Sequence, residues 1–417
     1  MGHEFLDRVI LQNGFLIDCT GNEPRENVTV VVEGKEIVEV TEKKTSAQGT
    51  VIDLGGRTIM PGLIDAHAHA CIVEESLQMN KIPTAKFVCM AAKNLEDMLM
   101  QGFTTVRDAY GADWGFRVAV EEGYMKGPRL LVSGDALSQT GGSGDPRRPT
   151  EYSVPEQGAV GLRSIVCDGV TEVRRAVREQ LRRGVDQIKV MASGAVVPAS
   201  PAGGGDLMTP EFTVDELKAA TYEASARGKY VMAHAYPPKS IENCVEAGIR
   251  SVEHGNLLDE DSAIMMKNHG TFLVPTVVTY DEIWSAGDKL GFSKETMRLV
   301  KMALEKSLDA VRIAHKVGVK MGSGSDLLYD SRKRMARELE LKATVLTSAE
   351  TLIATTKTNA ELLMLNDKIG TIEKGKIADI IVVNGNPLND IKVFQDYQQN
   401  VALIMKNGQI YKNNVET

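Results

Sequence analysis

The sequence is poor in cysteine and has no long apolar run, and each shortage excludes a class of protein. Five cysteines are scattered over 417 residues without a CxxC pair, so neither a disulfide framework nor a thiolate zinc site is expected. No run of about 18 apolar residues occurs, and Glu4 and Asp7 stand where a signal peptide has basic and then apolar residues. We therefore expect a cytoplasmic protein without a membrane span.

The chain also contains no long run of basic residues. The 48 Lys and Arg residues are outnumbered by 56 Asp and Glu residues, which gives a formal net charge of -8. Such a chain lacks the electrostatic footprint expected of a protein that binds nucleic acid or an anionic membrane. With 43% hydrophobic residues it can bury a large core, so we expect a globular protein that acts on a small molecule.

Two kinds of pattern divide the chain. Both ends contain short strands with Gly-containing turn signals, as in NVTVVVEGKEIVEV and NVALIMKNGQIY. The middle alternates short apolar strands with helix-period segments, which is typical of parallel βα units, and eight strand candidates can be counted. We therefore predict an α/β protein. A (β/α)8 TIM barrel over residues 61–365 carries a small β-sandwich domain built from residues 1–60 and 366–417.

Four of the seven histidines end a predicted barrel strand. His67 and His69 end the first, His234 the fifth and His254 the sixth, and Asp326 follows the eighth. Active sites of such barrels lie at the carboxyl ends of the strands, and residues two apart in a strand point to the same side. Neutral imidazoles and a carboxylate on one rim predict a catalytic divalent-metal site, for which Zn, Mn, Fe and Co are all suitable.

A metal site of this kind predicts hydrolysis. Bound metal ions make water acidic enough to supply hydroxide at neutral pH and polarise an amide carbonyl. Asp326 is placed to take the proton of the attacking water and return it to the leaving amine, which makes it the predicted catalytic residue.

Lys189 lies in the fourth predicted strand, QIKVMAS, between two apolar residues. If Ile188 and Val190 pack outward, the lysine points into the barrel, where an ammonium beside metal cations is costly. It is then either paired with a carboxylate or converted by carbon dioxide into a carbamate anion that bridges two metals. The residues alone leave both readings open.

Together these motifs resemble the amidohydrolase superfamily, within it the imidazolonepropionase-related group that contains prolidase-like metallo-dipeptidases acting on Xaa-Pro or Xaa-Arg bonds. The similarity runs nearly end to end through MPGLIDAHAH, GFTTVRDA, GPRLLVSG, QIKVMASG, MAHAY, SVEHGN, LVPT, GSD and GKIADIIVVNGNPL. It implies two divalent ions, with zinc as the expected metal, and the following ligands: His67, His69 and Asp326 on one ion, His234 and His254 on the other, and carboxylated Lys189 between them.

The resemblance also points to substrate contacts. The tyrosine of MAHAY, here Tyr236, looks like a contact for a substrate α-carboxylate, although an aromatic residue there can equally pack in the wall. Many relatives have a histidine in TGGxGD where this chain has Ser143, which puts strict prolidase activity in doubt. Arg147 and Arg148 in the same loop can clamp a carboxylate or simply be solvated. We expect a small-molecule substrate with a free carboxylate that is cleaved to release an L-amino acid.

Three functions remain to be weighed. The first is a binuclear hydrolase, either a prolidase-like dipeptidase or an N-acyl amino acid amidohydrolase for bulky acyl groups, similar to ochratoxin hydrolases. The second, a mononuclear deaminase of the same fold, has no need of Lys189. The third is a protein that has kept the barrel fold but has no catalytic activity. Such a protein would be expected to lose metal ligands, and all six residues of the implied ligand set are present. We favour the binuclear hydrolase, in a symmetric homo-oligomer.

Overall fold

The computed structural model describes residues 8–43, 45, 47–73, 82–153, 161, 163–197 and 207–415. Glu4 and Asp7, on which the expectation about a signal peptide rests, lie outside these residues. Within them, no helix has both the length and the apolar character needed to cross a membrane.

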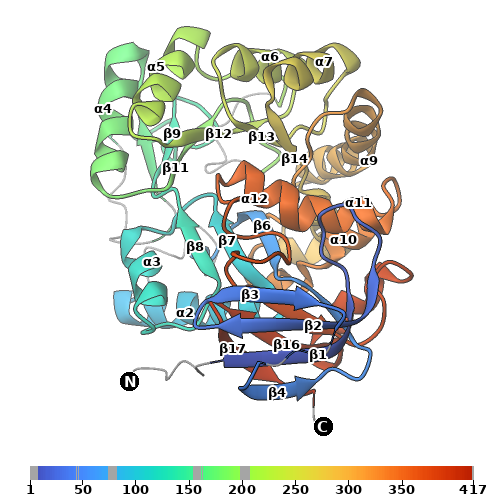
Figure 1. The fold of residues 1–417 in the computed structure, drawn as a ribbon. Helices are drawn as coiled ribbons and strands as arrows, with labels where there is room; N and C mark the ends of the chain where they lie inside the picture. Colours follow the sequence, from blue (N-terminus) through green and yellow to red (C-terminus); the bar gives the residue numbers. More distant parts are fainter. Residues whose placement is uncertain are drawn as a thin grey trace.

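Strands from both ends of the chain join in one eight-stranded sheet, which we call the terminal sheet (Figure 1). Its strands are β1 (Arg8–Leu16), β2 (Arg25–Glu33), β3 (Glu36–Thr41), β4 (Thr50–Asp53), β5 (Thr58–Pro61), β15 (Ile380–Val383), β16 (Val401–Lys406) and β17 (Gln409–Asn413). β5 pairs with β15 in antiparallel register, with Ile59 opposite Val382. The prediction that the two termini build one β unit is confirmed.

The strands of the terminal sheet are rich in apolar residues, and their side chains pack together in one core. Val30 and Val32 of β2, Val382 of β15 and Leu403 of β16 have at most 1% of their surface exposed and belong to one aliphatic cluster. β-branched and aliphatic residues favour strands, and their burial is the main stabilising term.

The middle of the chain forms a parallel barrel. Its strands, with two short extra ones, are β6 (Leu63–Ala68), β7 (Phe103–Asp108), β8 (Arg129–Val132), β9 (Ala136–Ser138), β10 (Ser164–Val166), β11 (Gln187–Met191), β12 (Tyr230–Ala235), β13 (Ser251–His254) and β14 (Phe272–Val274). All of their pairings are parallel.

The barrel strands form two sheets, β6-β7-β8 and β10-β9-β11-β12-β13-β14, and backbone hydrogen bonds join them at both gaps. Asp186 N, just before β11, donates to Val132 O of β8 at 2.8 Å. Gly322 N donates to Leu273 O of β14 at 2.8 Å, and Ala66 N of β6 donates to Ser323 O at 2.9 Å. The segment that contains Gly322 and Ser323 thus takes the place of the eighth strand between β14 and β6. The predicted α/β barrel is confirmed, and the carboxyl end of this segment leads directly to Asp326 beside the end of β6.

Helices surround the barrel (Figure 1). They are α2 (Thr84–Met100), α3 (Trp114–Glu121), α4 (Gly169–Arg182), α5 (Val214–Ser225), α6 (Pro238–Glu246), α7 (Glu260–His269), α8 (Val277–Ala286), α9 (Lys294–Val317), α10 (Arg337–Lys342), α11 (Ser348–Ile353), α12 (Asn359–Leu362) and α13 (Tyr397–Asn400). Shorter turns are η1 (Gly287–Leu290), η2 (Tyr329–Arg334), the π-helical η3 (Ala354–Thr358) and η4 (Ile391–Asp396).

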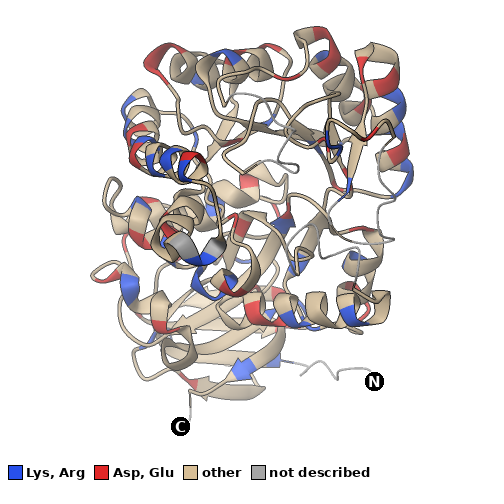
Figure 2. Cartoon of the chain, turned by 180° about the vertical axis from the view of Figure 1, so that it is seen from behind, with Lys and Arg blue, Asp and Glu red and all other residues tan. Residues whose placement is uncertain are grey.

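Local sequence sets the ends of these helices. Thr213 and Glu216 form a capping box at the start of α5, and Gly270, with φ of 70°, ends α7 in the left-handed conformation. Acidic and basic residues are interspersed along the outer helices (Figure 2). In α4, for example, Val173, Ala176 and Val177 belong to the core cluster around the barrel strands, whereas Arg178 and Arg182 are exposed.

Candidate metal centre

Four histidines from three strands meet at the carboxyl ends of β6, β12 and β13. His67, His69, His234 and His254 are each buried, with at most 7% of their surface exposed. Their rings form a continuous row, with centroid distances of 5.4 Å from His69 to His67, 4.9 Å from His67 to His254 and 4.7 Å from His254 to His234. The four imidazoles that the sequence placed on one rim therefore lie together.

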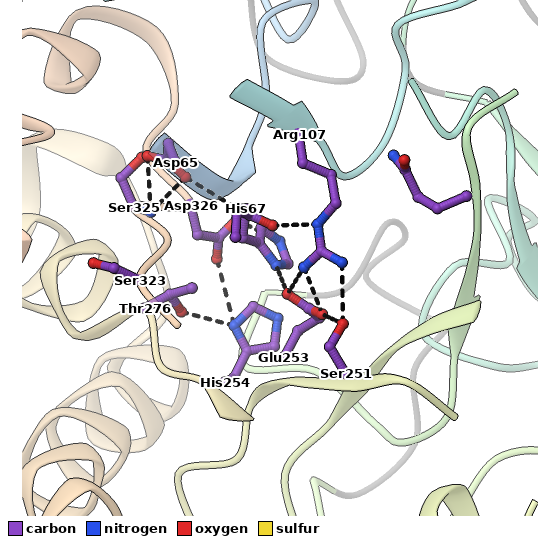
Figure 3. A network of polar contacts seen from close by, with 12 residues as sticks. Asp65, His67, Arg107, Ser251, Glu253, His254, Thr276, Ser323, Ser325 and Asp326 are labelled. Carbon is purple, nitrogen blue, oxygen red and sulfur yellow. Dashed lines mark hydrogen bonds and ion pairs between the residues drawn. The ribbon is translucent and has the colours of Figure 1, made fainter. Parts of the chain in front are cut away.

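Asp326 lies against this row (Figure 3). Its backbone N–H donates to His67 O at 2.8 Å, which ties it to the end of β6. One carboxylate oxygen lies 2.9 Å from His69 Nε2 and 3.5 Å from His67 Nε2, and the other lies 3.8 Å from His254 Nδ1. Ligand atoms of His67, His69 and Asp326 all lie within 4.8 Å of one another, so these three residues form a metal-binding group.

The backbone is strained at two of these positions. Asp326 has φ of 53° and His254 has φ of 69°, in the left-handed region that non-glycine residues seldom adopt. Such conformations cost free energy and persist where the surrounding structure demands them, as at functional sites. The strain turns both side chains toward the row of imidazoles.

Two of the imidazoles place one ring nitrogen against a backbone carbonyl, which leaves the opposite ring nitrogen as the possible metal ligand. His69 Nδ1 lies 3.4 Å from Tyr110 O and His234 Nε2 lies 3.3 Å from Gly194 O, both of which only accept hydrogen bonds. The opposite nitrogen of each ring then carries a lone pair. Burial lowers the pKa of His234 to about 3, so the ring is neutral, as a metal ligand must be.

Lys189 of β11 faces the same interior. It is 3% exposed, and burial lowers the pKa of its amine to about 8, although Glu253 and Asp326 oppose that shift. Among the described residues, none places a carboxylate oxygen within 4.0 Å of this amine. The lysine is therefore held in the barrel without an ion-pair partner from the described part of the chain.

Tyr236, next but one after His234, packs directly on the histidines. Its ring stacks on that of His254 at 5.3 Å and 14°, and it meets the ring of His234 edge-on at 4.7 Å. The Tyr236 hydroxyl lies 2.6 Å from the hydroxyl of Tyr280 in α8. Its phenol thus has a polar contact at its tip and lies beside two of the histidines.

Ser143 is buried, and its side chain is hydrogen-bonded within the protein. Its hydroxyl donates to Ser193 O at 2.9 Å, and its backbone N–H donates to the Glu211 carboxylate at 2.7 Å. Burial raises the pKa of Glu211 to about 8. Ser193 also accepts a hydrogen bond from Tyr236 N at 3.1 Å, so the loop of Ser143 is linked to the strand that carries His234.

The two arginines of that loop differ. Arg147 forms an ion pair with Asp145 at 2.6 Å, whereas Arg148 is exposed and its backbone N–H donates to Glu151. A clamp on a substrate carboxylate requires Arg147 to exchange this partner.

Several polar residues beneath the rim were missed by the sequence analysis. Asp65 accepts hydrogen bonds from His67 N at 2.9 Å and from Ser325 N at 3.2 Å, and thereby holds β6 to the segment before Asp326. Glu253 contacts His67 (Figure 3). Both carboxylates interrupt strands that are otherwise apolar or histidine-bearing, LIDAHA and SVEH, and that interruption is the signal from which they could have been found.

This geometry is matched by known proteins. The sequence matches the amidohydrolase family over residues 58–411. The chain belongs to the amidohydrolase family. A barrel with a His-His-Asp metal-binding group at its carboxyl rim is what that membership requires, and the protein is a metal-dependent amidohydrolase.

Relatives of this amidohydrolase include a prolidase, a Xaa-Pro dipeptidase and an ochratoxinase. A prolidase crystallised with N-methylphosphonate-L-proline is 40% identical, with a TM-score of 0.92 over 97% of this chain and 100% of that one. A Xaa-Pro dipeptidase with methionine in its active site is 29% identical, with a TM-score of 0.86 over 97% and 100%. Ochratoxinase of Aspergillus niger is 32% identical over 97% of this chain and 86% of its own length.

Proposed function

We propose that this amidohydrolase is a binuclear hydrolase that releases an L-amino acid from an amide. The observation that carries the proposal is the continuous row of four buried imidazoles with Asp326 against it. In our proposal His67, His69 and Asp326 hold one ion and His234 and His254 hold the other, with Lys189 between them. Two divalent ions, zinc in our proposal, supply Lewis-acid polarisation of the scissile carbonyl and acidify the attacking water.

Lys189 is proposed to carry a carbamate. Its neutral Nζ attacks the carbon of carbon dioxide, one C=O electron pair moves to oxygen, and the nitrogen loses a proton to water. The product is an anion with two oxygens. Its burial, and the lack of an ion-pair partner among the described residues, favour this modification over the paired lysine that the sequence left open.

Asp326 is proposed to move the proton. Its carboxylate lies at the rim within 2.9 to 3.8 Å of three imidazoles, where the attacking water must approach the substrate carbonyl. As general base it takes a proton from that water, and as general acid it returns the proton to the leaving nitrogen. The amine product therefore leaves neutral.

The substrate is proposed to be anchored by its α-carboxylate. The ligands named for two relatives, N-methylphosphonate-L-proline and methionine, each bear the α-carboxylate of an amino acid. Tyr236 lies beside His234 and His254, and a carboxylate held by its hydroxyl sets the scissile carbonyl near the histidines. Such fixed orientation supplies a large share of catalysis.

Dipeptides are the first substrate class that we propose, and N-acyl amino acids with a bulky acyl group are the second. The second is favoured by Ser143, because a serine leaves more room than the histidine of many dipeptidase relatives, and by the 32% identity to ochratoxinase. For either class the bond cleaved is an amide to the nitrogen of an L-amino acid.

The test is a substrate screen on purified protein whose metal content has been measured. Xaa-Pro and other dipeptides, and N-acyl amino acids, are compared with the same compounds carrying an amidated C-terminus. We expect about two ions per chain, and cleavage of the free acids that is much faster than cleavage of the amidated compounds. A single ion per chain with turnover of an amino-purine or similar ring would instead identify a deaminase and contradict the proposal.

We also propose a domain division and an oligomeric state for the enzyme. Residues 1–60 and 366–417 are proposed to act as one domain and residues 61–365 as the catalytic domain. The enzyme is proposed to assemble as a symmetric homo-oligomer, because assemblies of identical chains usually have closed symmetry. Light scattering of the purified protein measures its mass directly, and a monomer would contradict the assembly.

A further inference from the structure

A buried cluster of charge lies inside the barrel below the histidines (Figure 3). Arg107 of β7 and Ser251 and Glu253 of β13 are completely buried. The Arg107 guanidinium donates to both oxygens of Glu253, at 2.9 and 3.0 Å, and to the Ser251 hydroxyl at 3.0 Å. It also donates to Ala66 O of β6. The cluster therefore bridges three strands of the barrel.

Glu253 connects this cluster to the rim. One of its oxygens lies 2.8 Å from His67 Nδ1, and His67 is 1% exposed. An ionised carboxylate only accepts hydrogen bonds, so the proton of the neutral imidazole must be on Nδ1. The lone pair is then on Nε2, the atom that lies 3.5 Å from Asp326.

His67 differs in this respect from the other three histidines. His69 and His234 contact backbone carbonyls at 3.4 and 3.3 Å, and His254 Nδ1 contacts the hydroxyl of Thr276 at 2.8 Å. Among the four, only His67 has a hydrogen-bonded carboxylate opposite the nitrogen that is free for a ligand. A charged acceptor makes a shorter and stronger hydrogen bond than a neutral one and raises the basicity of the imidazole.

Arg107 gives the buried Glu253 carboxylate an opposite charge at ion-pair distance. A buried carboxylate without a partner is costly, whereas one terminal nitrogen of the Arg107 guanidinium contacts both Glu253 oxygens and supplies the opposite charge. Because both contacts of the arginine with Glu253 lie within 3.0 Å, the pair as a whole is neutral. It can therefore orient His67 without adding net charge beneath the site.

We propose that Glu253, held by Arg107 and Ser251, is a positioning residue that fixes His67 with Nδ1 protonated and so strengthens divalent-cation binding at Nε2. The inference rests on the proposed role of His67 as a ligand. It adds three residues, Glu253, Arg107 and Ser251, that touch neither substrate nor the reacting atoms, and the Ser251 hydroxyl itself donates to Glu253.

The test measures the dissociation constant of Zn²⁺ by competition with a chromophoric chelator, starting from metal-free protein. Glu253→Gln is expected to weaken binding by about 10- to 100-fold, the usual effect of losing a carboxylate behind a ligating histidine. The matched control is Glu338→Gln in α10. Glu338 is 1% exposed and accepts from Val278 N at 2.8 Å. This control is expected to keep the wild-type dissociation constant.

A second variant guards against loss of folding. Glu253→Gln leaves Arg107 buried without its counter-ion, so Arg107→Met with Glu253→Gln removes both charges together. Thermal unfolding of each metal-free protein reports folding separately from metal binding. If both variants fold and bind Zn²⁺ as tightly as Glu338→Gln does, the proposal is overturned. It is also overturned if neither variant folds, because the pair is then architectural.

A double-mutant cycle separates this inference from the proposed function. If Glu253 acts through His67, Glu253→Gln has no further effect on the dissociation constant in a His67→Ala background. An undiminished effect there overturns the positioning role and leaves the ligand assignment intact. Unchanged metal binding in His67→Ala alone overturns the proposed ligand set instead. The absorption spectrum of the Co²⁺-loaded protein gives an independent readout, since it should change in Glu253→Gln and not in Glu338→Gln.

Discussion

The core of the terminal sheet is aliphatic, whereas the interior of the barrel below its rim holds Asp65, Arg107, Lys189 and Glu253 at 3% exposure or less. Both interiors exclude water to the same degree. Apolar burial stabilises the terminal sheet, while each buried charge in the barrel costs free energy unless it is paired. The barrel interior thus holds charged residues beneath the row of histidines at a cost in stability, whereas apolar burial stabilises the aliphatic cluster of the terminal sheet.

The largest effect is expected from removing a proposed metal ligand at the barrel rim. His67→Ala is expected to be isolated without metal and without measurable activity, although weak binding of added Zn²⁺ stays measurable, because the ligand atoms of His67, His69 and Asp326 form one group within 4.8 Å. The fold should remain, since the aliphatic cores are untouched. Elemental analysis and circular dichroism measure the two effects separately.

The control for this change is His269→Ala. His269 lies at the exposed end of α7, where its ring contacts Met265 O. Its loss should leave metal content and activity unchanged. Full metal occupancy in His67→Ala would show that the buried imidazoles serve another purpose.

A smaller effect is expected when a rim group loses only its charge. Asp326→Asn keeps the size of the side chain but cannot take up a proton, so kcat should fall by about 10²- to 10⁴-fold while KM changes little. Metal content must be measured beside the kinetics, because Asp326 is also a proposed ligand. A variant with full metal and wild-type kcat would mean that another group moves the proton.

The reverse experiment alters the terminal sheet. Leu403 is completely buried in its aliphatic core, and Leu403→Ala should lower the free energy of unfolding by about 2 to 5 kcal/mol through the cavity left behind. Under native conditions kcat and metal affinity should match wild type. Urea unfolding followed by fluorescence measures the free energy of unfolding, steady-state kinetics measure kcat, and chelator competition measures the metal affinity. Metal loss in the folded variant would show that the terminal sheet also contributes to metal binding.

The sequence predicts the rim better than what lies beneath it. His67 and His69 are two apart at the end of a strand, so strand geometry alone puts them together. Asp326 follows from barrel closure, although its positive φ was not foreseen. The contact of Arg107 with Glu253 joins residues 146 apart in the chain. It depends on which side chains are long enough to meet across the barrel, and no local pattern encodes that.

The terminal sheet was easier to predict, because alternating apolar residues and Gly turns specify strands locally. Its strand order still could not be read from sequence. β5 lies between β1 and β15, an arrangement that follows from where the barrel begins and ends rather than from the strands themselves. Local signals thus predict elements and rim ligands, and packing decides the rest.

The smallest expected effect concerns the substrate end of the rim. Tyr236→Phe keeps the ring that stacks on His254 but removes the hydroxyl that contacts Tyr280 at 2.6 Å. If this hydroxyl holds the substrate carboxylate, KM should rise by about tenfold, the effect of one hydrogen bond to a charged group, and metal content should not change. Tyr280→Phe is the matched control, since it removes the partner and leaves the Tyr236 hydroxyl free to bind substrate. Steady-state kinetics on free and amidated substrates decide the matter: the Tyr236→Phe penalty must vanish for the amidated compounds, and a penalty equal for both would mean that the tyrosine only packs the wall.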